Sequence, residues 1–533
     1  MAEVAVYDTT LRDGTQREGI SLQCGDKIRI AKRLDELGVA FIEGGWPGSN
    51  PKDVEFFARA RDLPWHTAKI TAFGATRRAG ITVEDDPSIR ALISSGASVC
   101  TIFGKSSMLQ VTEVLRTKPD ENLRMIEESV AYLRGQGRRV IYDAEHFFDG
   151  YLLDAAYAVE SLRAAVRGGA EAVVLCDTNG GSLPWQVQEI VHSVGQSLKD
   201  NPIVLGMHAH NDGECAVANT LAAVRAGVRH VQGTINGYGE RCGNANLCAI
   251  MPDLELKLGM TCLPDGKLKE LYELSHFVAE VANLVPDEHM AYVGRSAFAH
   301  KGGVHVAAMR RHPQAYQHIE PELVGNSMRA VLSELSGKGN ILSKAEEFGL
   351  SMEDGAAVEL LDRIKQRESV GFSFEAAEAS TTLLMKRRTE GYRAPFRLIE
   401  YRVMVAQSEG STPRTEATIK IAVGNQVLHT AAEGNGPVSA LDAALRKALT
   451  PLYPSVRQIQ LVDYKVRILD GRDGTAATTR VLIDSSDGAQ TWSTVGASSN
   501  ILEASWQALG DSLEYGLGLG SQEPLAVAEG ALT

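Results

Sequence analysis

Near its N-terminus the chain reads Val4-Ala5-Val6-Tyr7-Asp8-Thr9-Thr10-Leu11-Arg12-Asp13-Gly14. The apolar run predicts a short buried strand, which Gly14 breaks. Arg12 and Asp13 therefore fall at the carboxyl end of that strand. An isolated Arg-Asp pair is most often a solvated surface ion pair. The function of this pair thus depends on which strands lie beside the first one.

The pattern of strand, turn and helix then recurs along the first half of the chain. The predicted strands cover residues 4–8, 41–45, 69–73, 98–103, 140–145, 172–176, 203–208 and 230–234. The predicted helices cover residues 26–37, 54–61, 89–95, 123–134, 153–167, 186–198, 214–226 and 246–257. Such an alternation over about 250 residues predicts an α/β fold, a (β/α)8 TIM barrel. A doubly wound sheet is disfavoured, because the first turn lacks the G-x-G-x-x-G pattern.

The length of 533 residues indicates two or three domains. We expect a catalytic barrel at 1–260, helical linker subdomains at 261–392, a C-terminal domain at 393–520 and a tail at 521–533. From about residue 396 the chain repeats itself, since Leu-Ile-Glu-Tyr-Arg-Val at 398–403 corresponds to Leu-Val-Asp-Tyr-Lys-Val at 461–466. Each copy continues with alternating strands and a helix. The duplication predicts two βββα units.

The composition excludes several classes of protein. There are 54 basic and 67 acidic residues, so the net charge is −13, and we expect no nucleic-acid partner because such proteins need a basic face. The seven cysteines include no C-x-x-C pair, which favours reduced thiols over a disulfide framework. Neither a secretory signal nor an apolar run of about 18 residues is found. We expect a cytoplasmic protein with no membrane segment.

Polar residues gather where the predicted strands end. In a barrel these ends share one face, which is where barrel enzymes hold their active sites. The polar residues there are Arg12, Asp13, Glu43, Glu145, Asp177, Thr178, Asn179, His208, His210, Glu240, Arg241 and Asn244.

His208-Ala209-His210 is the most specific of these signals. Residues i and i+2 of a strand point to the same side, so two imidazoles separated by a small alanine can converge on one ion. With Asp13 from the first strand they form a two-histidine, one-carboxylate set. Such a set leaves coordination positions open, as catalytic sites require. The donors permit Zn, Mn, Co or Fe, and also Mg with additional waters.

An open divalent site of this kind can hold a 2-oxo acid through its carboxylate and carbonyl oxygens. Arg12 would stabilise the negative charge that develops on the carbonyl oxygen, and Thr178 would donate a hydrogen bond to the carboxylate. Glu145 is the candidate general base. The other interpretation of Glu145 is a salt-bridged carboxylate of the barrel.

Three motifs in combination carry a resemblance that covers nearly the whole chain. Residues 9–14, the His208-x-His210-Asn211-Asp212 segment and the glycine-rich loop 237–244 resemble the Claisen-condensing acyltransferases of the metallolyase-type barrel superfamily. These are the 2-isopropylmalate, homocitrate and citramalate synthases. Residues 43–53 are most similar to the citramalate branch. The resemblance implies that acetyl-CoA is enolised, attacks pyruvate held by a divalent metal and is hydrolysed to (R)-citramalate, in isoleucine biosynthesis.

The resemblance also implies roles for individual residues. Asp13, His208 and His210 would hold the metal (Mn, Mg, Zn or Co), with Asn244 near or on it. Arg12, Glu145 and Thr178 would line the reacting centre, and Arg12 and Asp13 would contact substrate. His305 and Tyr316 match a subdomain motif that reaches the neighbouring subunit's active site as acid/base partners near the CoA thioester. This implies a homodimer.

The C-terminal domain resembles the regulatory domain of the same synthases, with isoleucine as the implied effector. Two loops lead into the two predicted helices of this domain, and helix N-termini offer N–H groups to a carboxylate. The candidate regulatory residues in these loops are Gly434, Asn435, Gly436, Gly496, Ser498 and Asn500. The alternative is a dimerisation domain without a ligand.

Three other functions stay open from the sequence. The same chemistry on a branched 2-oxo acid would give 2-isopropylmalate, and one or two methylenes change binding by only about 1–3 kcal/mol. A lyase or aldolase of the same superfamily is a second alternative, against which the duplicated C-terminal domain argues. A barrel that only binds a partner is the third, and Arg12, Glu145 and His208 argue against it.

Overall fold

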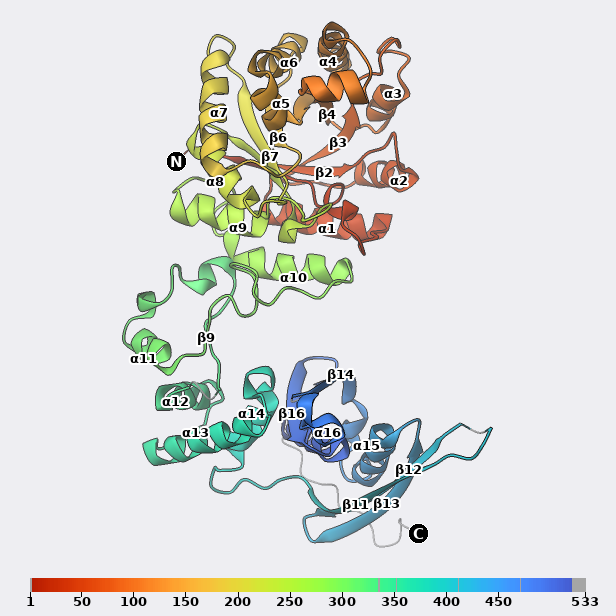
Figure 1. Ribbon diagram of the computed structural model, residues 1–533, viewed down its shortest axis with the longest axis vertical. Helices are drawn as coiled ribbons and strands as arrows, with labels where there is room; N and C mark the ends of the chain where they lie inside the picture. The colour runs from red at the N-terminus through yellow and green to blue at the C-terminus, as the bar shows by residue number, and fades with distance from the viewer. Residues whose placement is uncertain (1, 334–335, 351, 411, 470, 520–533) are drawn as a thin grey trace. The chain divides into compact units, whose positions relative to one another are not determined.

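The computed structural model describes residues 2–333, 336–350, 352–410, 412–469 and 471–519 (Figure 1). The predicted tail at 521–533 lies outside the described residues. The described residues form two compact units, one made of residues 2–298 and 319–328 and the other of residues 299–318 and those described between 329 and 519. The finer domain limits that the sequence predicts stay a proposal. Within the described ranges, no helix is long and apolar enough to cross a membrane.

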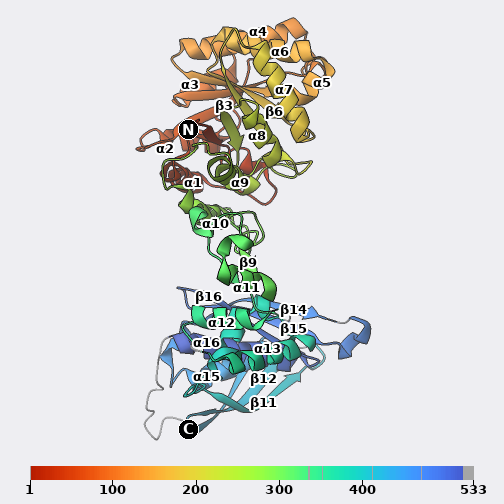
Figure 2. The ribbon, with the colours of Figure 1, turned by 90° about the vertical axis from the view of Figure 1, so that its left-hand side faces the viewer.

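The first unit contains the predicted TIM barrel. Its eight parallel strands close in chain order, because β1 pairs with both β2 and β8. The strands are β1 (Ala5–Asp8), β2 (Phe41–Gly45), β3 (Lys69–Ala75), β4 (Val99–Lys105), β5 (Arg139–Glu145), β6 (Ala172–Asp177), β7 (Val204–Ala209) and β8 (His230–Gly233). Figures 1 and 2 show the helices of this unit outside the strands.

The helices of the first unit follow the predicted order with small shifts, except that the one at Phe147–Leu153 was not predicted. They are α1 (Cys24–Leu37), α2 (Pro51–Ala60), α3 (Pro87–Ser94), α4 (Pro119–Gly135), α5 (Phe147–Leu153), α6 (Ala155–Gly168), α7 (Pro184–Ser197), α8 (Ala216–Arg225), α9 (Leu247–Pro252) and α10 (Leu271–Val281). Short helical turns cover Gly14–Gln16, Gln110–Val114, Ile235–Gly237, Asp253–Lys257 and Leu268–Glu270.

Two predicted helices differ from the observed ones for clear reasons. The helix predicted at 153–167 begins at Ala155, because the side chain of Asp154 caps it by accepting a hydrogen bond from Tyr157 N at 3.0 Å. The helix predicted at 246–257 ends its α-helical part at Pro252 and continues as a π-helical turn. Proline has no N–H, so the regular ladder of hydrogen bonds is interrupted there.

Apolar side chains fill two layers of the barrel. The larger cluster lies between strands and helices and includes Ile30, Leu34 and Phe56, all fully buried. A smaller cluster, with Tyr7 and Val174, packs separately from it and consists of strand residues on the alternate face, as a filled barrel interior requires. Side chains therefore fill the barrel interior, and polar groups lie at its carboxyl end.

The second unit holds the helical segment and the duplicated C-terminal domain. Its first elements are β9 (Ala299–His300), α11 (Gly303–Arg311), β10 (Arg329–Ala330), α12 (Lys338–Glu347), α13 (Asp354–Ser369) and α14 (Glu378–Lys386), with helical turns at Pro313–Ala315 and Phe374–Ala376. The turn Pro321–Val324 belongs to the first unit. The two-residue ladder of β9 and β10 is an addition to the helices and loops predicted here.

The predicted duplication of βββα units is confirmed. The first copy is β11 (Arg397–Ala406), β12 (Arg414–Val423), β13 (Gln426–Gly434) and α15 (Pro437–Leu449). The second is β14 (Gln460–Ile468), β15 (Thr479–Ser486), β16 (Thr491–Ser498) and α16 (Ile501–Leu519), and helical turns at Pro454–Arg457 and Gly471–Ala476 flank β14. Each sheet is antiparallel. Along β12 buried residues alternate with more exposed ones, so one face packs on the helix.

Candidate active site

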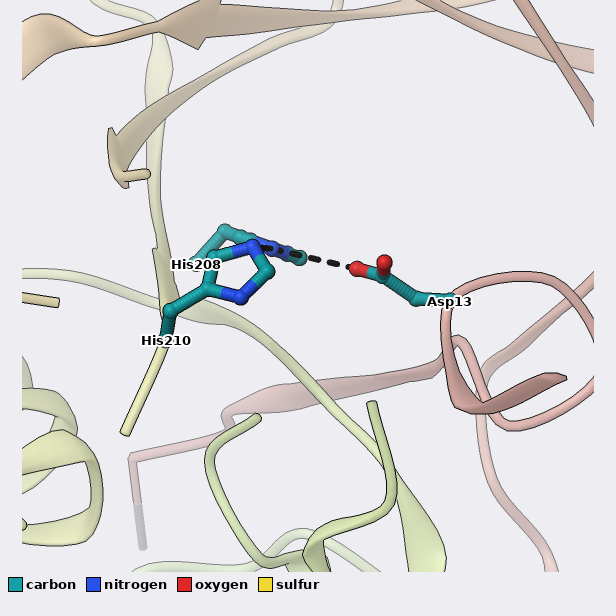
Figure 3. Close-up of side chains that lie close together, drawn as sticks. All are labelled: Asp13, His208 and His210. Carbon is teal, nitrogen blue, oxygen red and sulfur yellow. Dashed lines mark hydrogen bonds and ion pairs between the residues drawn. The ribbon is translucent and has the colours of Figure 1, made fainter. Parts of the chain in front are cut away.

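Asp13, His208 and His210 form a compact cluster at the carboxyl end of the barrel (Figure 3). His208 belongs to β7, His210 follows it directly, and Asp13 comes from the loop after β1. His208 Nε2 lies 3.3 Å from Asp13 Oδ2 and 3.4 Å from His210 Nε2. One ligand atom from each residue lies within 4.8 Å of the other two. The sequence thus correctly predicts that these three side chains meet.

The donors in and beside this cluster suit a divalent cation. All three side chains are buried, and burying converging lone pairs without a compensating partner is costly. Within the described residues, His210 Nδ1 and Asn244 Oδ1 are buried and have no hydrogen-bond partner. His210 and Asn244 are joined by a backbone bridge. Imidazole nitrogen and carboxylate oxygen are ligands for Zn, Mn and Co.

The charges of the cluster are strongly coupled. Burial raises the pKa of Asp13, but Arg12 and then His208 outweigh it, so the pKa lies well below its usual range. Burial lowers the pKa of His208, yet the hydrogen bond and the charge of Asp13 produce a net rise. The pKa of His210 is lowered to about 4 by burial and by His208. Neutral His210 is therefore available as a ligand at neutral pH.

A cavity of about 210 Å³ opens beside the cluster. Eight of the polar residues predicted at this face line it, namely Arg12, Asp13, Glu145, Thr178, His208, His210, Glu240 and Arg241. The other lining residues are Gln16, Trp46, Phe73, Phe103, Asp143 and Cys176. Asn244 lines a separate cavity, together with Gly237, Tyr238 and Cys242 of the glycine-rich loop.

Arg12 is held in a fixed orientation. Its Nε donates to Glu43 Oε1 at 2.5 Å, and its Nη1 lies 3.1 Å from Asp13 Oδ1. Its guanidinium carbon lies 3.8 Å from the centroid of the Phe73 ring, a favourable cation–π geometry. Glu43 is fully buried and also accepts a hydrogen bond from Tyr7. It holds Arg12 through this contact and does not line the cavity.

Glu145 and Thr178 face the same cavity from β5 and from the end of β6. Glu145 forms an ion pair with Lys105, so the salt-bridged interpretation of this carboxylate describes a real contact. It also lines the cavity, and the two properties are compatible. Thr178 Oγ1 accepts a hydrogen bond from His146 N at 2.8 Å, which leaves its hydroxyl proton free to be donated into the cavity.

Sequence comparisons place this geometry in a known family. Residues 3–278 match the HMGL-like family, residues 292–371 the homocitrate synthase post-HMGL domain-like family and residues 375–517 the LeuA allosteric (dimerisation) domain. The chain is 54% identical to the (R)-citramalate synthase of Geobacter sulfurreducens over 520 residues, which cover 97% of this chain and 98% of that one. The corresponding enzyme of Synechocystis is 53% identical over 98% of both chains.

The chain belongs to the (R)-citramalate synthase family. A 2-isopropylmalate synthase of Sulfolobus acidocaldarius is less similar, at 35% identity over 71% of this chain and 94% of that one. The citramalate branch that residues 43–53 indicate is thus confirmed.

Several residues around this cluster were missed by the sequence reasoning. Asp143 Oδ1 accepts from Gln232 Nε2 at 3.0 Å, and Gln232 Oε1 lies 2.9 Å from His208 Nδ1. Burial raises the pKa of Asp143 to about 7, although His208 opposes the rise. Asp143 stands two residues before Glu145 on the same strand. The period of two in a strand is the signal that could have found it.

Three aromatic residues of the cavity were also missed. The ring centroids of Trp46, Phe73 and Phe103 lie 5.4–5.7 Å from one another. The backbone N of Trp46 donates to Asp53 Oδ2 at 2.8 Å, and Asp53 forms a buried ion pair with Lys27. Apolar strand residues are expected in any barrel core, so their types alone did not mark them as cavity residues.

Two predicted strand-end residues have structural contacts instead. Asp177 Oδ2 accepts from Ser182 N at 3.2 Å, before α7 begins. Asn179 Nδ2 donates to Asp149 Oδ2 at 2.7 Å. Neither residue lines the cavity of the cluster.

His305 and Tyr316 belong to the second unit and lie next to each other. Their rings stack with centroids 4.1 Å apart and planes 24° apart. His305 is exposed, and 46% of the Tyr316 side chain is exposed. Two exposed stacked rings are available to another chain, and their catalytic role stays a prediction.

Residues of the predicted regulatory loops make contacts that stabilise the C-terminal domain. A Cβ at Gly434 would lie 2.4 Å from Ala440 N, and one at Gly496 would lie 1.9 Å from Ala504 O. Both glycines therefore allow a strand to pack against its helix. Asn500 Oδ1 accepts from Leu502 N at 2.9 Å and so caps α16. Binding of an effector by Gly434, Asn435, Gly436, Gly496, Ser498 and Asn500 stays a prediction.

Proposed function

We propose that this chain condenses acetyl-CoA with pyruvate and hydrolyses the thioester, giving (R)-citramalate and CoA. One observation carries the proposal. A chain that is 54% identical to an (R)-citramalate synthase brings Asp13, His208 and His210 together beside Arg12 in one small cavity. A divalent ion held by these ligands would supply Lewis-acid polarisation of the 2-oxo group. Water is the third reactant, because it hydrolyses the thioester and releases CoA.

The protein's own groups account for the other requirements of the reaction. Glu145 would accept a proton from the methyl group of acetyl-CoA, and its contact with Lys105 holds the carboxylate at the cavity. Arg12 would stabilise the negative charge on the oxygen of the 2-oxo group, because two neighbouring carboxylates already fix its orientation. Thr178 would donate its hydroxyl proton to the carboxylate of pyruvate.

The aromatic residues of the cavity limit the size of the substrate that can bind. Trp46, Phe73 and Phe103 occupy the space next to Arg12, where the side chain of a 2-oxo acid would lie. The methyl group of pyruvate needs less space than the isopropyl group of 2-oxoisovalerate. The aromatic residues would therefore favour pyruvate by steric exclusion.

Assembly and regulation are part of the same proposal. The match of residues 375–517 to a LeuA allosteric (dimerisation) domain supports a homodimer. Isoleucine would be its feedback effector, in isoleucine biosynthesis. His305 and Tyr316 would act in the active site of the neighbouring subunit. The free cysteines, five of them buried, support a reducing compartment such as the cytoplasm.

Identification of the product tests the proposal. Purified protein with Mn²⁺ is incubated with pyruvate and acetyl-CoA labelled with ¹³C in the acetyl group. We expect one labelled C5 hydroxydiacid that co-elutes with (R)-citramalate on a chiral column. A labelled product from 2-oxoisovalerate and none from pyruvate would contradict the choice of substrate and keep the chemistry.

A further inference from the structure

Gln232 connects the proposed metal ligand His208 to the buried acid Asp143. His208 and Gln232 face each other in the register of β7 and β8, and their side chains meet at 2.9 Å between Nδ1 and Oε1. On the far side Gln232 Nε2 donates to Asp143 Oδ1 at 3.0 Å. Gln232 is fully buried, Asp143 is 4% exposed and His208 is 6% exposed.

The acid determines which end of the amide faces the histidine. A glutamine side chain offers an acceptor at one end and a donor at the other. Because Asp143 Oδ1 accepts from the amide nitrogen, the amide oxygen is left for His208. All three groups are buried, and a reversed amide would leave buried polar atoms unmatched.

The amide oxygen in turn determines the tautomer of the neutral imidazole. An acceptor at 2.9 Å requires the proton of His208 to be on Nδ1, which then donates to Gln232. The lone pair is therefore on Nε2. Nε2 is the atom that lies within 3.4 Å of both Asp13 Oδ2 and His210 Nε2. Hydrogen bonds from the non-ligating nitrogen are the usual means by which proteins orient a ligating histidine.

We propose that Gln232, oriented by Asp143, is a positioning residue that holds His208 in the tautomer and rotation needed to bind a divalent cation. This inference rests on the proposed metal-dependent function. It assigns to Asp143, which also lines the cavity, an effect on His208 that is exerted through Gln232. It also gives a reason for burying a carboxylic acid and an amide inside the barrel.

Substitutions of Gln232 and Asp143 separate the effect of the acceptor on His208 from the effect of the acid that orients the amide. Gln232→Leu removes the acceptor, so His208 loses the group that fixes its tautomer and rotation. Gln232→Glu keeps an acceptor toward His208 and serves as the conservative rescue, with one of the two neighbouring acids, the introduced carboxyl group or Asp143, protonated in place of the lost N–H. Asp143→Leu leaves Gln232 in place but free to turn its nitrogen toward His208, which would favour the tautomer that cannot ligate through Nε2.

Cobalt binding is the direct test. Co²⁺ is titrated into metal-free full-length protein, and the visible absorption of bound Co²⁺ and competition with a chromophoric chelator give Kd. We expect Gln232→Leu to weaken Co²⁺ binding about 10–100-fold, Asp143→Leu to weaken it by a smaller factor, and Gln232→Glu to remain within about threefold of wild type. At saturating metal the turnover of Gln232→Leu should recover, which misfolding would not allow.

The outcomes distinguish this inference from the proposed function. If wild type binds Co²⁺, His208→Ala abolishes binding and Gln232→Leu binds as wild type does, the positioning role is overturned and the metal site stands. If wild type does not bind the ion, both the metal-dependent function and this inference are overturned. A Gln232→Glu variant as weak as Gln232→Leu would also overturn the role of the acceptor.

Discussion

Arg12 Nε lies 2.5 Å from Oε1 of Glu43, so an arginine of the loop after β1 is fixed by a fully buried carboxylate of β2. Charge-assisted hydrogen bonds of this kind hold the plane of a guanidinium group. The same group packs on Phe73. Arg12 therefore presents its remaining N–H groups to the cavity in one orientation.

Replacement of Arg12 should abolish turnover and leave metal binding largely intact. Removing one donor to a developing oxyanion typically lowers kcat 10²–10³-fold, and we expect at least that loss for Arg12→Ala. Arg12→Lys should restore little, because an ammonium cannot bridge Glu43 and the substrate as a planar guanidinium does. Steady-state kinetics with Mn²⁺ and a parallel metal titration measure both effects. Turnover of Arg12→Ala within threefold of wild type would remove Arg12 from the mechanism.

Removal of His208 should abolish metal binding and turnover together. His208→Ala deletes the central ligand of a cluster whose other members are Asp13 and His210. Elemental analysis after dialysis against Zn²⁺ or Mn²⁺ gives the metal content, and CoA release gives the rate. Full activity of a protein without bound metal would refute the proposed chemistry.

Replacement of Glu145 should affect the chemical step more than substrate binding. Glu145→Gln keeps the size of the side chain but cannot take up the proton, and general bases contribute about 10²–10⁴-fold. We expect kcat to fall by that factor with KM for pyruvate little changed. Lys105→Met is the matched control, since it removes the ion-pair partner and keeps the carboxylate. Equal losses for both variants would favour a purely structural carboxylate.

Enlarging the aromatic side of the cavity should broaden the range of substrates. Phe103→Leu opens space beside Trp46 and Phe73, and a methylene is worth roughly 1–3 kcal/mol. We expect the ratio of kcat/KM for 2-oxobutyrate to that for pyruvate to rise about tenfold or more. Kinetics with both acids measure this ratio. An unchanged ratio would show that other residues limit the size of the substrate.

His230 should make the barrel less stable at low pH. Burial lowers its pKa to about 4, and its ring packs against Tyr7 and Phe41. The unfolded chain takes up a proton below about pH 6.5, whereas the folded protein does not. The contribution of neutral His230 to the free energy of unfolding is therefore complete above pH 6.5. It is lost as the pH falls toward 4, and the total loss is roughly 3 kcal/mol.

Urea unfolding of wild type and His230→Phe at pH 7.5, 5.5 and 4.5 measures this effect. Wild type should lose more unfolding free energy than the variant as the pH falls, because other buried groups such as His210 are common to both. Parallel pH profiles of the two proteins would contradict the assignment.

The barrel and its cluster could be predicted because they follow from periodicity. Each strand ends near a glycine or polar residue, and parallel strands place those ends on one face. His208 and His210 share one side of a strand for the same reason. Asp13 could be added because β1 must lie beside β8 in a closed barrel.

The supporting contacts could not be predicted because they depend on which strand lies opposite which. Gln232 pairs with His208 only through the register of β7 and β8, and Asp143 meets Gln232 across the barrel interior. Glu43 was predicted among the strand-end polar groups, but only its contact with Arg12 shows that it supports another side chain. The two-residue strands β9 and β10 are too short to produce a periodic pattern.

The most direct test of the central claim is CoA release from acetyl-CoA by the purified protein. The rate is measured with pyruvate, 2-oxobutyrate, 2-oxoisovalerate and 2-oxoglutarate in the presence of Mn²⁺, each with and without isoleucine or leucine. We expect the highest kcat/KM with pyruvate and inhibition by isoleucine. Preference for 2-oxoisovalerate with inhibition by leucine, or no release with any of the four acids, would contradict the account.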